Sequence, residues 1–197
     1  MIIEYEDKRP TIDESAYVAP TAVVRGDVYI GSGTAVLFGA VISAEGGAVE
    51  IGSDCVVMEN AVIRGVPDNP VRIGDRVLIG PRAHLSGCQV QDDSFLATGS
   101  TVFNGAVIEK DVEVRVNAVV HVNTRLTEGS VVPIGWVAVG DPAHCYAASE
   151  HEKIWEIQRE LDFPGTVWGV SRAVRKGQRT KRYAQALLKH KKDLIID

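Results

Sequence analysis

Residues 90–132 read VQDDSFLATGSTVFNGAVIEKDVEVRVNAVVHVNTRLTEGSVV, and an aliphatic residue stands at every sixth position of this stretch. The series is Val90, Leu96, Val102, Ile108, Val114, Val120, Leu126 and Val132. An amphipathic helix returns an apolar residue every three or four positions, and a half-buried strand every two. The period of six therefore predicts a short strand followed by a corner, repeated around a solenoid.

The same spacing occurs earlier in the chain, at Val18, Val24, Ile30, Val36 and Ile42, then at Ile51, Val57 and Ile63, and again at Ile73, Ile79 and Leu85. Three such units close one triangular coil with an aliphatic pointing inward from each side, and successive coils hydrogen-bond about 4.8 Å apart. Hexapeptide spacing is typical of the left-handed parallel β-helix. We predict an all-β solenoid of this kind over residues 1–145, with about six coils.

Two interruptions of the repeat predict loops on the solenoid. Ile51 comes nine residues after Ile42, and Ile73 ten after Ile63, so three and four residues are in excess of the period; residues 44–47 and 65–70 are the expected loops. Loops of this kind are either neutral insertions or places where a ligand or a second subunit binds. The sequence leaves both interpretations open.

The repeats stop after residue 143, and residues 146–197 are predicted to form a helical segment packed along the solenoid. Ser149 is the expected N-cap of a first helix. Residues 171–192 are expected to form a second, basic helix or a helix pair. Residues 168–192 carry nine Lys and Arg and no acid, so residues 168–197, with two acids, have a net charge of +7. The first 167 residues have a net charge of −12.

The charge pattern bears on partners. The formal net charge of −5 argues against a general nucleic-acid binder. The basic tail at 168–192 is open to two interpretations: a solvated cationic face lying over the acidic body, or a surface that contacts RNA or anionic lipid.

The cysteine pattern and the hydropathy bear on location. The cysteines Cys55, Cys88 and Cys145 form no CxxC pair and leave an odd thiol, which favours a reducing compartment. The N-terminus does not resemble a secretory signal, and no apolar run approaches the roughly 18 residues that a membrane span needs. We predict a cytoplasmic protein with no membrane span.

Three segments, 17–28, 73–80 and 139–143, resemble the γ-class carbonic anhydrases of the hexapeptide-repeat superfamily, and the resemblance covers residues 10–162. It implies a homotrimer with sites in the clefts between neighbouring subunits. It also implies zinc, iron or cobalt bound by three histidines. In this sequence the corresponding positions hold Arg64, Pro81 and Ser86.

These three residues are unsuited to a metal. A guanidinium cannot ligate a divalent cation, proline has no side-chain donor, and a lone serine hydroxyl is a poor ligand. We therefore predict no metal site, no cofactor and no carbonic anhydrase activity. Counting coils places two of these residues, Arg64 and Ser86, on one column along the solenoid, which runs Arg25, Ser43, Arg64, Ser86, Phe103 and His121.

Two functions are consistent with such a protein. The first is a trimeric binding or scaffold protein whose cleft accepts a small anionic ligand; Arg64, Arg82 and His84 would donate to it, Ser86 would line the site, and Glu45 would pair with Arg64 or line the mouth. The alternative is a CoA-dependent acyltransferase or related CoA-ester enzyme. His84 would then be the catalytic base, with His121 the next candidate.

Overall fold

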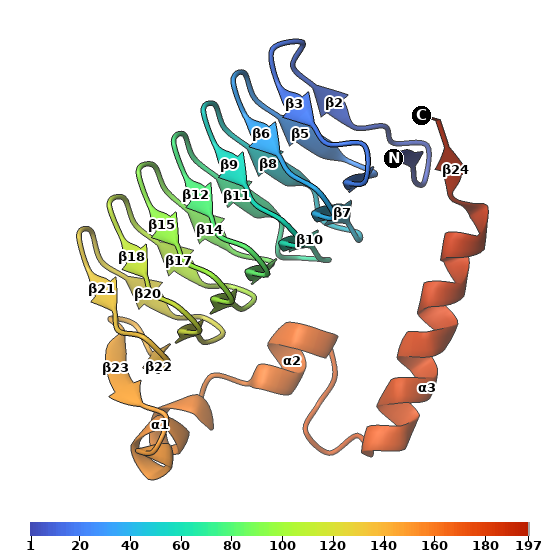
Figure 1. The fold of residues 1–197 in the computed structure, drawn as a ribbon. Helices are drawn as coiled ribbons and strands as arrows, with labels where there is room; N and C mark the ends of the chain where they lie inside the picture. The colour runs from blue at the N-terminus through green and yellow to red at the C-terminus, as the bar shows by residue number, and fades with distance from the viewer. Residues whose placement is uncertain (197) are drawn as a thin grey trace.

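The computed structural model describes residues 1–196, which form a parallel β-solenoid followed by helices that return along its side (Figure 1). The three faces of the solenoid are three β-sheets, and the second and third sheets each contain seven parallel strands. The second sheet contains β2 (Thr11–Ile12), β5 (Val28–Ile30), β8 (Val49–Ile51), β11 (Val71–Ile73), β14 (Gln89–Val90), β17 (Val107–Ile108) and β20 (Arg125–Leu126). The third contains β3 (Tyr17–Val18), β6 (Ala35–Val36), β9 (Val56–Val57), β12 (Leu78–Ile79), β15 (Phe95–Leu96), β18 (Glu113–Val114) and β21 (Val131–Val132).

The first sheet is longer and carries the residues of the site. Its parallel strands are β1 (Ile2–Glu4), β4 (Val23–Arg25), β7 (Val41–Ala44), β10 (Val62–Gly65), β13 (His84–Ser86), β16 (Thr101–Val102), β19 (Val119–Val120) and β22 (Trp136–Val139). Two antiparallel strands close its ends: β23 (His144–Ala147) pairs with β22, and β24 (Leu194–Ile195) pairs with β1. The chain's last strand thus lies beside its first.

The hexapeptide prediction of a left-handed parallel β-helix is confirmed, but the predicted number of coils is too low. The first sheet gives about eight turns instead of six. The count missed both ends of the solenoid, because the first turn is interrupted by a turn closed between Tyr5 and Lys8. In the last turn Ala138 occupies the inward position that larger aliphatics hold elsewhere.

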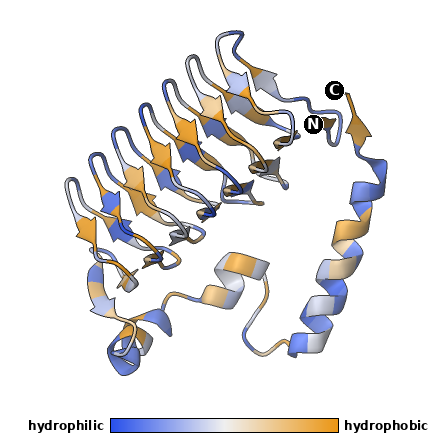
Figure 2. Ribbon diagram, in the orientation of Figure 1, coloured by the Kyte–Doolittle hydropathy of each residue, from blue (hydrophilic) through white to orange (hydrophobic). Residues whose placement is uncertain are grey.

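The core is the stack of inward aliphatics that the repeat predicts. Ile30, Ile51, Ile79 and Leu96 are fully buried, and each side chain of this size contributes about 1.5–3 kcal/mol when it is removed from water. Strands coloured as hydrophobic therefore alternate with polar corners along the solenoid in Figure 2. At corners the backbone turns through positive φ, as at Gly39, where an added Cβ would collide with the amide of Asn60 in the next coil.

The C-terminal segment contains α1 (His151–Gln158), α2 (Phe163–Trp168), α3 (Lys176–Leu187) and the 3₁₀-helix η1 (Leu188–Lys192). The predicted cap at Ser149 is wrong: α1 begins at His151, and its N-cap Glu150 makes no capping side-chain bond. Helix α2 was not predicted. Its N-cap Asp162 accepts a hydrogen bond from the Gly165 amide, which holds a six-residue helix that propensity alone would not.

The helices run back along the solenoid toward its N-terminal end, as Figure 1 shows. No helix within residues 1–196 is long and apolar enough to cross a membrane. The last residue of the predicted 146–197 segment lies outside the described residues.

Candidate functional site

The predicted column of residues exists and lies on the outer face of the first sheet. Arg25 pairs in register with Ser43, Ser43 with Arg64, and Arg64 with Ser86. Each of these residues follows an inward aliphatic, so its side chain points away from the core. The C-terminal segment of the same chain covers this column, and it contacts the column at three levels.

At the lower level, Arg25 anchors the end of the chain. Its Nε lies 2.6 Å from Asp193 Oδ2, and its Nη1 lies 3.2 Å from Glu45 Oε2 and from Ser43 Oγ. The Arg25 guanidinium also lies 3.6 Å from the ring centroid of Tyr5. Because Arg25 is only 5% exposed, both carboxylates neutralise a charge that water does not reach.

His190 completes this lower cluster. Its Nε2 lies 3.0 Å from Glu45 Oε1, and its Nδ1 lies 3.1 Å from Asp193 Oδ2. Lys189 adds a longer ion pair, with its Nζ 3.9 Å from Glu45 Oε1. The tail thus contacts the acidic body at η1, whereas Lys181 and Arg182 of α3 are exposed to solvent.

At the upper level the contacts are apolar. Phe163 of α2 packs edge-on against Phe103, and its ring centroid lies 5.4 Å from that of His121. His121 is buried, and burial lowers the pKa of its imidazole to about 4. Its Nδ1 has no hydrogen-bond partner within residues 1–196, and the ring is therefore a neutral member of an aromatic cluster.

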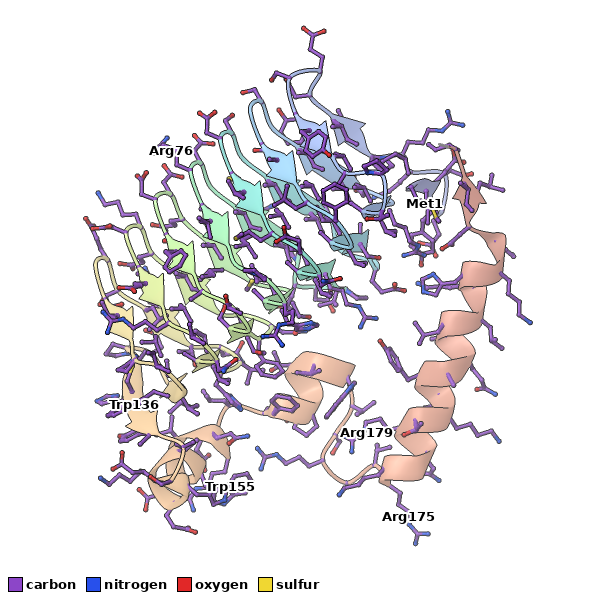
Figure 3. The ribbon with its side chains drawn as sticks, in the orientation of Figure 1. Met1, Arg76, Trp136, Trp155, Arg175 and Arg179 are labelled. Carbon is purple, nitrogen blue, oxygen red and sulfur yellow. The ribbon has the colours of Figure 1, made fainter. Side chains whose placement is uncertain are left out.

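Between these two levels the column faces a cavity of about 520 Å³. Its floor is the solenoid and the 65–70 loop, and its roof is α2 and α3. Residues that line it include Glu45, Arg64, Ser86, Asn104, Trp168, Tyr183 and Lys189. Arg179, labelled in Figure 3, reaches from α3 toward α2, where its guanidinium lies 4.3 Å from the ring centroid of Trp168 and ties the two helices of the roof together.

Arg64 is the cation of the middle level. It donates a hydrogen bond to the hydroxyl of Tyr183 in α3, and its guanidinium lies 5.9 Å from that ring's centroid. Among residues 1–196 no carboxylate lies within 4.0 Å of Arg64, unlike Arg25 two coils below. Within the chain Glu45 does not pair with Arg64: it pairs with Arg25, His190 and Lys189, and it lines the cavity. A pair between Arg64 and Glu45 of neighbouring subunits stays a prediction.

The structure separates the other predicted site residues from the cavity. Arg82 is exposed at a corner with φ of 57° and does not line the cavity. His84 lies in β13 two residues before Ser86; burial, and then the charge of Arg64, lower the pKa of its imidazole. Pro81 lies against the third sheet, in a groove with Met58 and Phe95. Arg64 and Ser86 are therefore adjacent, and Pro81 is not beside them.

The donor chemistry of these positions does not fit a metal. Within one chain, residues 1–196 contain no group of three His, Cys, Asp or Glu side chains placed to hold an ion. Arg64 and Ser86 offer a guanidinium and a hydroxyl where imidazoles would be needed.

Several residues of the site escaped the sequence analysis. Tyr183, Lys189 and His190 come from the C-terminal segment, which meets the column across more than 100 residues of chain. Asn104 resembles any polar corner residue of the repeat. The one available signal was the pair of cations on the column, because Arg25 and Arg64 stand there without an acidic residue at any column position.

The fold and this column define a hexapeptide-repeat β-solenoid, and comparison with known proteins agrees. The chain is 39% identical to γ carbonic anhydrase 1, mitochondrial, of Arabidopsis thaliana over 131 residues, which are 64% of this chain and 48% of the relative. It is 32% identical to a carbonic anhydrase of Geobacillus kaustophilus over 108 residues, 55% of this chain and 59% of the relative. The protein is thus a γ-carbonic-anhydrase-like member of the hexapeptide-repeat proteins.

Two further findings show how far this similarity extends, in sequence and in fold. The chain spans about half the length of the curated relatives it matches, and no family model matches it. A solved structure of the UDP-N-acetylglucosamine O-acyltransferase of Moraxella catarrhalis superposes with a TM-score of 0.52 at 20% identity, covering 93% of this chain and 89% of that one. That likeness concerns the fold alone.

Proposed function

We propose that this protein is a metal-free, homotrimeric binding protein of the γ-carbonic-anhydrase type that accepts a small anion, and that it does not hydrate CO₂. The observation that carries the proposal is the column: Arg64 and Ser86 stand where the resemblance implies histidines, and the chain's own helices cover them. Hydration at neutral pH needs a metal that brings the pKa of water near 7, and these side chains cannot hold one.

The anion-accepting site of this proposal is the cavity that one chain forms by itself, in which Arg64 is a cation without a carboxylate partner in the chain. The sequence analysis placed the site in a cleft between subunits. The C-terminal segment supplies a wall to the cavity without a second copy. We retain the cytoplasm as the proposed location; three of the relatives are named as mitochondrial proteins.

Metal analysis of the purified protein tests the proposal directly. We expect less than one tenth of a zinc, iron or cobalt ion per chain after growth in metal-supplemented medium, and no CO₂ hydration above the rate in buffer. A zinc-binding carbonic anhydrase purified from the same medium is the positive control for metal uptake. Stoichiometric metal in the unmodified protein would disprove the proposal.

The homotrimer is supported by the contrast between the solenoid's faces. The outward residues of the third sheet are largely apolar, and Tyr17, Phe95 and Val131 are 49%, 40% and 42% exposed. The outward residues of the second sheet include Glu50 and Arg72, which pair with each other. An apolar face of this kind is typical of a surface covered by another copy of the chain.

A second candidate function, acyl transfer from a CoA ester, has one observation in its favour. Burial and Arg64 keep the His84 imidazole neutral, and a general base must be neutral to accept a proton. If His84 acts in this way, His84→Ala abolishes acetyl-CoA-dependent labelling of hydroxyl or amine acceptors while the thermal unfolding temperature stays unchanged. Equal labelling by both proteins, or none by either, removes this candidate.

A further inference from the structure

Two polar side chains that line the cavity, Asn104 and Arg64, have hydrogen-bonding groups for which the chain supplies no partner or only part of one. Asn104 is 1% exposed, and its Nδ2 donates to the Thr166 carbonyl at 3.2 Å, but its Oδ1 has no hydrogen-bond partner. Arg64 has no carboxylate partner among residues 1–196. A buried acceptor without a donor costs about 1–3 kcal/mol, so an orphan of this kind in a cavity wall indicates a ligand group that completes it.

We infer that this cavity binds a small monocarboxylic acid whose carboxylate meets Arg64 and whose amide or hydroxyl donor meets Asn104 Oδ1. The inference rests on the proposed function, because a metal at Arg64 and Ser86 would exclude it. The planar guanidinium matches a carboxylate with two parallel hydrogen bonds. Ser86, in the coil between those of Arg64 and Asn104, also lines the cavity.

The charges of the lining favour a monoanion. Arg64 and Lys189 are the cations, and Glu45 and Asp68 are the anions. The Glu45 carboxylate pairs with Arg25 and His190, but its negative charge remains in the wall of the cavity. A phosphate dianion would bring a second negative charge toward these carboxylates, whereas a carboxylate matches the one free guanidinium.

The geometry sets the length of the ligand. Arg64, Ser86 and Asn104 belong to three successive coils, so Arg64 and Asn104 lie about 10 Å apart along the sheet. The ligand therefore spans about 4 Å if its hydrogen bonds run along the sheet and about 10 Å if they run perpendicular to it, so about three to eight bonds separate the carboxylate from the donor. The intervening body faces Val66, Val167 and Trp168 and is therefore apolar.

Three probes test each part of this description. These are 6-acetamidohexanoate, which has both groups, octanoate, which lacks the donor, and the methyl ester of 6-acetamidohexanoate, which lacks the charge. By isothermal titration we expect 6-acetamidohexanoate to bind about fivefold more tightly than octanoate and at least tenfold more tightly than the ester. Inorganic phosphate is the fourth arm, and tighter binding of phosphate than of 6-acetamidohexanoate overturns the carboxylate assignment.

Two variants assign the groups to residues. Arg64→Gln weakens both acids at least tenfold, whereas Asn104→Leu weakens 6-acetamidohexanoate about fivefold and leaves octanoate unchanged. Arg72→Gln, on the second sheet, is the matched control and binds like the unmodified protein. Unaltered circular dichroism and unfolding temperature show that each variant is folded; if Asn104→Leu is not, Asn104→Ala replaces it.

The outcomes separate this inference from the proposed function. Metal content is measured on the same preparation. A metal-free protein that binds none of the probes at 10 mM, or binds the ester as tightly as the acid, overturns the inference and leaves the proposed function intact. Stoichiometric metal overturns both.

Discussion

His121 shows how one residue of the repeat acquires a property that its position alone does not imply. Its ring is enclosed by Phe103 and Phe163, and burial lowers its pKa from the ordinary 6.5 to about 4. Between these pH values the unfolded chain binds a proton that the folded chain does not. The free energy of unfolding therefore falls as the pH drops through this window.

Replacing the imidazole removes this pH dependence. Between pH 7.5 and pH 4.5 protonation of His121 in the unfolded chain should lower the free energy of unfolding of the unmodified protein by about 2.5 kcal/mol. His121→Phe lacks this loss, so its stability relative to the unmodified protein should rise by the same amount. Urea unfolding at the two pH values measures the difference. The exposed His144→Phe serves as the control, and an equal change in both variants would show that His121 is not the cause.

At the scale of elements, the C-terminal segment is held at its two ends and spans the cavity between them. Helix α3 has no buried residue, and its contact with the column is made by Tyr183. The lower end is fastened by η1 and β24, through Arg25, Asp193 and the pairing of β24 with β1. We expect the ion pair at Arg25 to be a main contact that holds this end of the segment.

Removing the charge of Asp193 should release this end. In Asp193→Asn we expect amide hydrogen exchange across 176–196 and tryptic cleavage within 175–192 to accelerate at least fivefold, with little change in the solenoid. The corner variant Asp111→Asn, which removes an exposed carboxylate, should behave like the unmodified protein. Unchanged exchange in Asp193→Asn would mean that α3 is held by other contacts.

The ion pair between Arg25 and Asp193 also makes the fold depend on pH. Here the folded chain favours the charged form of the side chain, whereas at His121 it favours the neutral form. Although burial favours the neutral acid, the hydrogen bonds from Arg25 and His190 outweigh it and lower the pKa of Asp193 below its ordinary 3.8. The attachment is therefore fully present above about pH 4 and is lost as the pH falls through the lowered pKa. Hydrogen exchange across 194–196, corrected for its intrinsic pH dependence, should accelerate below pH 4 in the unmodified protein and not in Asp193→Asn.

At the scale of the whole molecule, the solenoid has one apolar and one polar face, and its first sheet is covered by the chain itself. If the proposed trimer assembles through the third sheet, the cavity on the first sheet is left to each chain. In that arrangement the surface for association and the proposed ligand site lie on different faces of the solenoid.

A charge placed on the apolar face should disrupt the trimer. We expect the unmodified protein to have three times the 21.3 kDa mass of one chain in light scattering coupled to size exclusion, and Phe95→Glu to have the mass of one chain. Gln89→Glu makes the same change on the second sheet and should remain trimeric. A monomeric unmodified protein at micromolar concentration would contradict the predicted assembly.

The sequence by itself determined the solenoid and the column, because both depend on spacing. An aliphatic at every sixth residue dictates which side chains point inward, and the excess residues in two loops set the register that stacks Arg25, Ser43, Arg64 and Ser86. The number of coils was underestimated where irregular turns break that spacing. Helix α2 was missed because its six residues carry no periodic signal.

Only the tertiary structure decided what the column meets. Spacing within the repeat says nothing about where a helical segment more than 100 residues away will dock, since docking depends on shape and on charges supplied by both sides. The pairing of Asp193 with Arg25, the contact of Tyr183 with Arg64 and the unpartnered oxygen of Asn104 all arise from that docking. The cavity, and with it the proposed ligand, is a property of the folded chain.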